Sequence, residues 1–96
     1  MSDTAAVVLL VEGDIVVRHP LAQYLRDCGF KVIEAATGEE AMQSFRVPGI
    51  VIDVVLADMT TSGSGFALRQ WILARSPSVD VILAGSLEKI SFFGRS

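Results

Sequence analysis

The sequence is poor in the residues on which many small catalytic and metal sites depend. Its 96 residues include one cysteine, Cys28, and one histidine, His19. A single cysteine forms no internal disulfide, and neither residue has the companions that a zinc site or a Cys/His catalytic pair requires. The sequence therefore argues against both kinds of site. We expect His19 on a helix surface and Cys28 as a small residue of the core.

Basic charge and long apolar segments are also lacking. Eight Lys and Arg stand against eleven Asp and Glu, for a net charge of −3, and the scattered basic residues form no face for nucleic-acid phosphates. No apolar run approaches the roughly 20 residues that cross a bilayer, and the opening "MSDTAA" has no signal-peptide features. We therefore expect a cytoplasmic protein without membrane association, whose partners are proteins or small ions.

Apolar residues, in contrast, make up 51% of the chain, which is enough for a packed core. A chain of this length forms one domain, and no repeat, low-complexity tract or linker divides it. We predict a single domain over residues 1–96, with its core in residues 6–86 and a divergent tail in residues 87–96.

Short apolar segments alternate with segments of helical periodicity. The predicted strands, which are short, apolar and rich in β-branched residues, are 7–11, 31–35, 50–58 and 79–85. The predicted helices are 15–28, 38–46 and 66–75. This alternation predicts an α/β fold with a parallel sheet and helices on both of its faces.

Two of the helix starts carry local signals. Thr37 stands three residues before Glu40, which is the spacing of a capping box. Pro20 would cost roughly 3 kcal/mol inside a helix that began directly after Asp14, because it removes one backbone hydrogen bond and clashes with the preceding turn. We therefore expect the first helix to start later, near Arg18, or to bend.

Acidic residues stand at the ends of two predicted strands. Glu12 and Asp14 follow the first strand in "VVLLVEGD", and Asp58 ends the third in "IVIDVVLAD". Parallel strands end at one edge of the sheet, and ligands bind outside that edge. If the first and third strands are neighbours, in the order 2-1-3-4, the three carboxylates lie close together and repel unless a cation such as Mg²⁺ sits between them. A carboxylate beside Mg²⁺ can also attack a phosphoryl group.

Three stretches together carry a family resemblance. They are the acids after the first strand, "GFKVIEAATGEEA" through the second strand and helix, and "DVVLAD" with Asp58 at its end. Over about residues 6–86, the chain resembles the receiver domain of bacterial two-component response regulators. The resemblance covers nearly the whole chain, and its specificity comes from the three stretches together.

The resemblance implies a flavodoxin-like (CheY-like) fold with strand order 2-1-3-4. It implies that Asp58 is the phosphoacceptor and that Mg²⁺ is held by Glu12, by Asp58 and by the backbone carbonyl of Thr60. The phosphoryl donor would be a sensor histidine kinase or a phosphotransfer protein, and phosphorylation would switch protein–protein interactions. On this interpretation the domain is not an enzyme.

The chain departs from the family pattern around the expected site. Gly13 replaces the second of two adjacent acids, and it has no side chain to coordinate a metal. Asp14 is a further candidate ligand if the backbone turns inward, although its default role is to cap the first helix. After Asp58 the usual proline is missing from "TTSGSG". The switch hydroxyl of the family maps only approximately to Ser86.

The C-terminal tail departs as well, because the family's fifth strand and its lysine are not visible. Lys89 follows the fourth strand too closely to be that lysine, since a parallel crossover takes about a dozen residues. The sequence thus suggests a truncated chain or a diverged tail, in which residues 87–93 begin a fourth helix. A fourth strand with an exposed edge would pair with a second copy, which predicts a homodimer.

Three other functions are open. The first is a pseudo-receiver that keeps the fold as a protein-interaction module without phosphorylation. A flavodoxin-like cofactor binder would use "TTSGSG" as a phosphate loop, but such loops normally follow the first strand of that fold. An aspartate-nucleophile phosphatase would need a general-acid aspartate where Thr60 stands.

Overall fold

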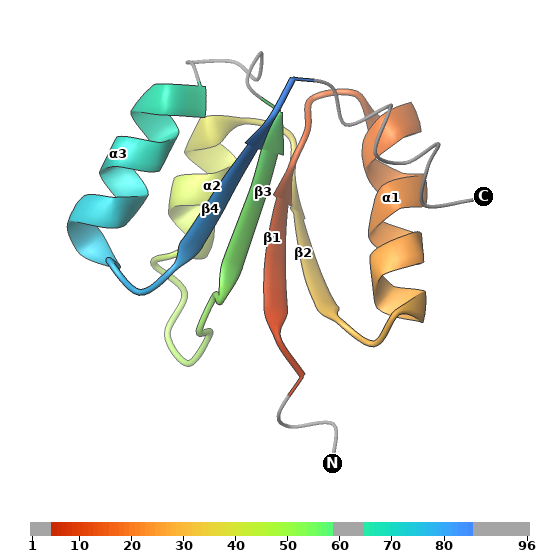
Figure 1. Cartoon of the computed structure of the whole chain (residues 1–96), viewed down its shortest axis with the longest axis horizontal. Coiled ribbons are helices and arrows are strands. Elements are labelled where there is room, and N and C mark those ends of the chain that lie inside the picture. Colours follow the sequence, from red (N-terminus) through yellow and green to blue (C-terminus); the bar gives the residue numbers. More distant parts are fainter. Residues whose placement is uncertain (1–4, 59–64, 86–96) are drawn as a thin grey trace.

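Four strands of five residues form one parallel sheet in the computed structural model, which describes residues 5–58 and 65–85 (Figure 1). The strands are β1 (Val7–Val11), β2 (Lys31–Ala35), β3 (Val54–Asp58) and β4 (Asp80–Ala84). Their order, β2-β1-β3-β4, confirms the predicted order 2-1-3-4 and the flavodoxin-like fold. The described residues contain no fifth strand.

The third strand is shorter than predicted, because its partner β1 begins only at Val7. Val54 is the first residue of β3 in register with β1, where it lies opposite Val8. The preceding residue, Asp53, donates its backbone N–H to the Val7 carbonyl at 2.9 Å and accepts the Val7 N–H on Oδ2 at 2.8 Å. This pair of hydrogen bonds closes the amino-terminal end of the sheet.

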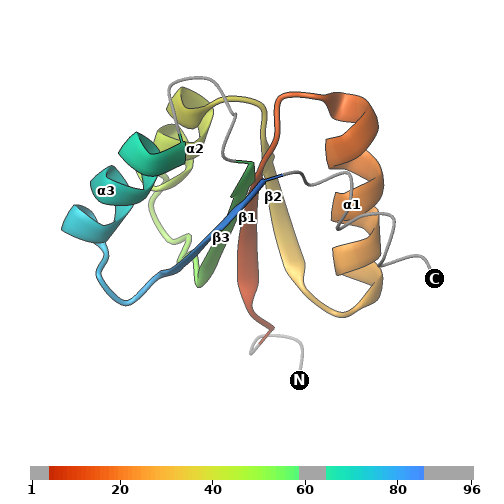
Figure 2. The same ribbon diagram turned by 45° about the horizontal axis from the view of Figure 1, so that its top comes forward.

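Three helices cover the sheet, namely α1 (Ile15–Asp27), α2 (Gly38–Ser44) and α3 (Gly65–Arg75). Figures 1 and 2 show α1 on one face and both α2 and α3 on the opposite face. The helices in the described part of the chain include none with the length and apolar character needed to cross a membrane.

The first helix begins at Ile15, so the expected start near Arg18 is wrong. Asp14 caps it: Oδ1 accepts the Val16 N–H at 2.9 Å, and the Asp14 carbonyl accepts the Arg18 N–H at 2.8 Å. Pro20 lies inside the helix and leaves the Val16 carbonyl without its helical donor. Val16 is exposed, so water can supply that hydrogen bond. The helix therefore starts at the Asp14 cap and continues through the proline, whose cost is lowered because the freed carbonyl lies at an exposed residue.

The second helix begins as the capping-box spacing predicts. Thr37 Oγ1 accepts the Glu40 N–H at 3.1 Å, and Glu40 Oε1 accepts the N–H of Ala36, the residue before the cap, at 2.8 Å. The expectation that Cys28 belongs to the core is wrong, because Cys28 is exposed. The helix α1 ends at Asp27, and Cys28 caps it before the left-handed Gly29, with φ of 102°, turns the chain towards β2.

Alternate residues of the strands pack into two apolar clusters, one on each face of the sheet. The larger joins the sheet to α2 and α3, and it includes Leu9, Val11, Val55, Leu68 and Ile72. The smaller joins it to α1, and it consists of Leu10, Val17, Leu21 and Ala22. Strands that are buried on both faces explain the continuous apolar runs of the sequence.

Candidate functional site

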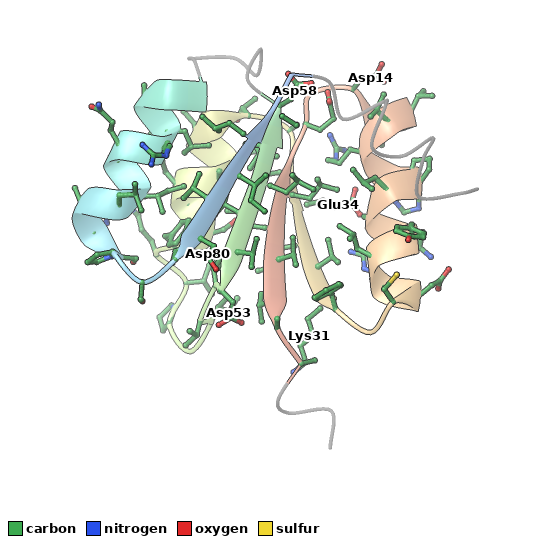
Figure 3. All side chains as sticks on the ribbon, in the orientation of Figure 1. Asp14, Lys31, Glu34, Asp53, Asp58 and Asp80 are labelled. Atoms are coloured by element: carbon green, nitrogen blue, oxygen red, sulfur yellow. The ribbon has the colours of Figure 1, made fainter. Side chains whose placement is uncertain are left out.

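The register of β1 against β3 brings two acids together at the carboxyl edge of the sheet. Val11 pairs with Ala57, so the next residue of each strand, Glu12 and Asp58, reaches the same edge. Figure 3 shows Asp58 at the same end of the molecule as Asp14, which lies two residues beyond Glu12. Asp58 is only 8% exposed and is the one buried charged residue of the described part of the chain. A carboxylate that is buried at the sheet edge where ligands bind is a functional candidate.

Three hydrogen bonds hold Glu12 in position. Its N–H donates to the Ala35 carbonyl at 3.0 Å, which extends the pairing of β1 with β2 by one residue. Its carboxylate oxygen Oε2 accepts the Asp14 N–H at 2.8 Å. Its carbonyl oxygen accepts a hydrogen bond from Arg18 Nη1 at 2.9 Å. The loop after β1 therefore presents the Glu12 carboxylate in a defined position.

The pKa of the Glu12 carboxyl group reflects its closeness to Asp58. Burial is the largest influence on the Glu12 carboxyl group and raises its pKa, and both hydrogen bonding to Asp58 and the charge of Asp58 raise it further. The charge of Asp14 acts in the same direction, while the hydrogen bond from the Asp14 backbone lowers the pKa by less than the sum of the other effects. The proximity of Asp58 and Asp14 therefore disfavours the charged form of Glu12.

The donors at this edge fit a hard divalent cation. Mg²⁺ takes oxygen ligands and commonly binds through one or two carboxylates, with water filling the remaining positions. Glu12 and Asp58 supply two such carboxylates, and their mutual repulsion would be relieved by the cation. The described residues do not assemble a group of three or more His, Cys, Asp and Glu that could hold a metal ion. The third acid, Asp14, directs Oδ1 to the Val16 N–H, which confirms the expected helix cap.

Neither the backbone conformation nor the neighbouring atoms require a glycine at position 13. Its φ lies outside the left-handed region, and a Cβ added there would meet only the Ala36 carbonyl oxygen, at an ordinary contact distance of 3.5 Å. A larger residue would therefore fit, and the glycine costs the site a carboxylate without giving the loop a conformation that other residues cannot adopt.

Two of the predicted site residues, Thr60 and Ser86, lie outside the described residues. Gly85, to which the position of the family's switch hydroxyl maps, follows β4 directly and is exposed at the carboxyl edge. The roles of Thr60 and Ser86 therefore stay predictions.

An ion-pair cluster between α1 and β2 was not expected from the sequence. Glu34 accepts hydrogen bonds from Arg18 Nε at 3.1 Å and Arg26 Nη1 at 3.3 Å, and its Oε2 lies 3.3 Å from His19 Nδ1. Burial alone would raise the pKa of Glu34, but the hydrogen bonds from these three side chains lower it overall. The sequence held one signal, since Glu34 is a charged residue in the interior of β2, and Figure 3 shows its side chain on the side of α1.

The chain resembles known proteins in sequence and in structure. No protein-family model matches the chain. A cyclic di-GMP phosphodiesterase of Thermotoga maritima is 40% identical over 77 residues, which are 79% of this chain and 20% of that protein. The chain thus spans about a fifth of the length of this curated relative.

Solved structures of receiver domains share the fold of this chain. The chemotaxis response regulator CheY4 of Vibrio cholerae superposes with a TM-score of 0.77 at 27% identity, over 90% of this chain and 75% of that one. The chain has the fold of a response regulator receiver domain. The receiver domain of Saccharomyces cerevisiae Ssk1, which was crystallised with the histidine phosphotransfer protein Ypd1, has the same fold. It superposes with a TM-score of 0.72 at 18% identity, over 91% of this chain and 73% of that one.

The receiver fold confirms the family resemblance and supports a role in two-component signalling. Receiver domains are in general signalling modules rather than enzymes, and they typically bind Mg²⁺. In this receiver domain, the buried Asp58 and the neighbouring Glu12 occupy the positions at which the resemblance expects the phosphoacceptor and a metal-binding acid.

Proposed function

We propose that this receiver domain accepts a phosphoryl group on Asp58 and thereby switches its affinity for a partner protein. The observation that carries the proposal is the buried Asp58 carboxylate, which lies beside Glu12 at the carboxyl edge of the sheet. The phosphoryl donor is a sensor histidine kinase or a phosphotransfer protein. The Ssk1 receiver, which was crystallised with such a protein, supports this class of partner through its shared fold.

The proposed reaction uses a side-chain oxygen of Asp58 as the nucleophile. This oxygen attacks the phosphorus of a phosphohistidine, so that a P–O bond forms and the P–N bond to the donor imidazole breaks. The products are an acyl phosphate on Asp58 and the free histidine of the donor. Mg²⁺, when bound by Glu12, Asp58 and the Thr60 carbonyl, would neutralise charge on the transferring oxygens. Glu12 contributes by lying next to Asp58, and the sheet contributes by excluding water from one side of the carboxylate.

The output is proposed to be a change in protein–protein interaction, with Ser86 as the switch hydroxyl. A homodimer through the edge strand β4 belongs to the same proposal, and a monomeric mass by light scattering would count against it. Hydrolysis of cyclic di-GMP, which the name of the Thermotoga relative describes, is not included. The reason is that the chain corresponds to only one fifth of that protein.

Gly13 favours a second candidate, the pseudo-receiver. The position has room for a side chain, yet it supplies no second acid to the metal site. Loss of a metal ligand weakens charge stabilisation in the transition state, and the domain could then act through its surface without phosphorylation.

Phosphorylation with a small donor separates the two candidates. We expect incubation with acetyl phosphate and Mg²⁺ to add the mass of one phosphoryl group to the intact protein. Asp58→Asn should abolish the addition, because it removes the nucleophile. Asp80→Asn is the matched control, since Asp80 is an exposed aspartate at the opposite end of the sheet (Figure 3). An unchanged mass in the parent protein would favour the pseudo-receiver.

A further inference from the structure

Arg18 connects the candidate site to the ion-pair cluster between α1 and β2. Its Nε donates to Glu34 Oε1 at 3.1 Å, and its Nη1 donates to the Glu12 carbonyl oxygen at 2.9 Å. The Arg18 side chain is only 13% exposed, so its guanidinium group is largely removed from water. One side chain thus bridges a strand and the loop that carries Glu12.

The position of Arg18 on α1 needs compensation. It lies at the end of the first turn of the helix, where the helix dipole is unfavourable to a cation. Partial burial of the guanidinium group adds a desolvation cost. The hydrogen bonds to Glu34 and to the Glu12 carbonyl offset both effects, so the orientation of the side chain is fixed by its two partners.

The hydrogen bond from Arg18 to the Glu12 carbonyl oxygen matters because Gly13 follows Glu12 in the loop. Gly13 allows the loop backbone more conformations than any other residue would. The Arg18 hydrogen bond fixes the peptide group between Glu12 and Gly13, and the Ala35 carbonyl fixes the Glu12 N–H at 3.0 Å. Without Arg18, Glu12 would lose one of the two hydrogen bonds to its own backbone groups, directly before Gly13.

We propose that Arg18 is a positioning residue, which holds the Glu12 backbone so that the Glu12 carboxylate stays beside Asp58. This inference rests on the proposed function, because its consequence for activity assumes that Glu12 and Asp58 bind Mg²⁺. Arg18 touches the carbonyl of Glu12 and the carboxylate of Glu34. It therefore orients the acid of the site without neutralising it.

Arg26 provides a matched control on the same helix. Its Nη1 also donates to Glu34, at 3.3 Å, and its Nη2 donates to the Val32 carbonyl at 3.1 Å. It makes no hydrogen bond to Glu12 among the described contacts. Arg26→Gln therefore weakens the same ion-pair cluster but leaves the loop restraint intact.

The first measurement is amide hydrogen exchange without metal. In Arg18→Gln, we expect the Asp14 amide, which donates to Glu12 Oε2, to exchange on the order of tenfold faster through loss of a charge-assisted hydrogen bond. The Glu40 amide, which makes the corresponding capping bond in α2, should keep its rate. Arg26→Gln should leave both amides unchanged. Arg18→Lys serves as a second variant if Arg18→Gln folds poorly, because it keeps the charge but loses the guanidinium fork.

The second measurement is calorimetric titration with Mg²⁺ alone. We expect Arg18→Gln to raise the Kd for Mg²⁺ by about tenfold, as for other groups that orient metal ligands, and Arg26→Gln to change it little. Equal exchange of the Asp14 amide in the Arg18 and Arg26 variants would overturn the inference. Faster exchange in the Arg18 variant, with no Mg²⁺ binding by the parent protein, would support the positioning of Glu12 and overturn the proposed metal site instead.

Discussion

Two glutamates of this domain lie in opposite electrostatic environments. Glu34, between α1 and β2, is surrounded by Arg18, His19 and Arg26, whose hydrogen bonds lower its pKa against the effect of burial. Glu12, at the carboxyl edge of the sheet, has a raised pKa because it is partly buried next to Asp58. Among the described residues, the neighbours of Glu34 therefore favour its charged form, whereas the acidic neighbours of Glu12 disfavour its charged form.

The difference separates a structural cluster from a candidate site. A carboxylate that is paired with basic side chains joins two elements of the fold and does not require a bound cation. Two neighbouring carboxylates repel each other, and this repulsion is relieved when a cation binds between them, alone or together with a phosphoryl group. Arg18 contacts both glutamates. It forms an ion pair with the Glu34 carboxylate, but it donates only a hydrogen bond to the Glu12 carbonyl oxygen.

The largest effect on stability is expected for Glu34→Gln. This variant leaves the mostly buried Arg18 without an ion-pair partner, so the free energy of unfolding should fall by about 2 kcal/mol. Glu12→Gln is the comparison variant: it removes repulsion from Asp58 while keeping an oxygen that can accept the Asp14 N–H. It should raise the free energy of unfolding by about 0.5 kcal/mol in metal-free buffer. Urea denaturation measures both, and a change of the same sign in the two variants would contradict the contrast.

The sequence predicted the sheet well because its strands are buried on both faces. Continuous apolar runs located the strands, and the rule that parallel strands end at one edge brought Glu12 and Asp58 together. That adjacency also depends on the strand order 2-1-3-4, which the family resemblance implied and the sheet confirms.

Features that depend on competing local interactions were harder to predict. The start of α1 required weighing the Asp14 cap against Pro20, and the exposure of Cys28 depends on the residue at which that helix ends. The contact of Arg18 with Glu34 joins residues 16 positions apart, and its geometry depends on how α1 packs against β2. None of these is visible in hydrophobic periodicity alone.

An intermediate effect is expected for Gly13→Asp, which adds a carboxylate to the already acidic edge. The variant should bind Mg²⁺ about tenfold more tightly, because the number of charged ligands increases. In metal-free buffer it should be less stable than the parent, since the new charge lies near Glu12 and Asp58. Gly13→Ala is the control, because a Cβ at this position makes only an ordinary contact. Calorimetric titration with Mg²⁺ tests the affinity, and equal affinity in the Asp and Ala variants would count against Mg²⁺ binding at this edge.

The smallest effect is expected in the pH dependence of stability. The folded-state pKa of Glu34 is lowered, so its contribution is fully present above the ordinary value of 4.5 and is lost as the pH falls through the folded-state pKa. Unfolding of the parent protein in metal-free buffer should therefore become easier between about pH 5 and pH 3. Glu34→Gln should show a flatter profile in this range, because it has no carboxylate to protonate there. Solvent screening keeps the difference small, since the Glu34 side chain is 21% exposed.

Glu12 acts in the opposite direction, because protonation of a group with a raised pKa favours the folded state. Thermal unfolding of both proteins at several pH values measures the difference, and parallel profiles would show that the three basic side chains do not stabilise the charged form of Glu34.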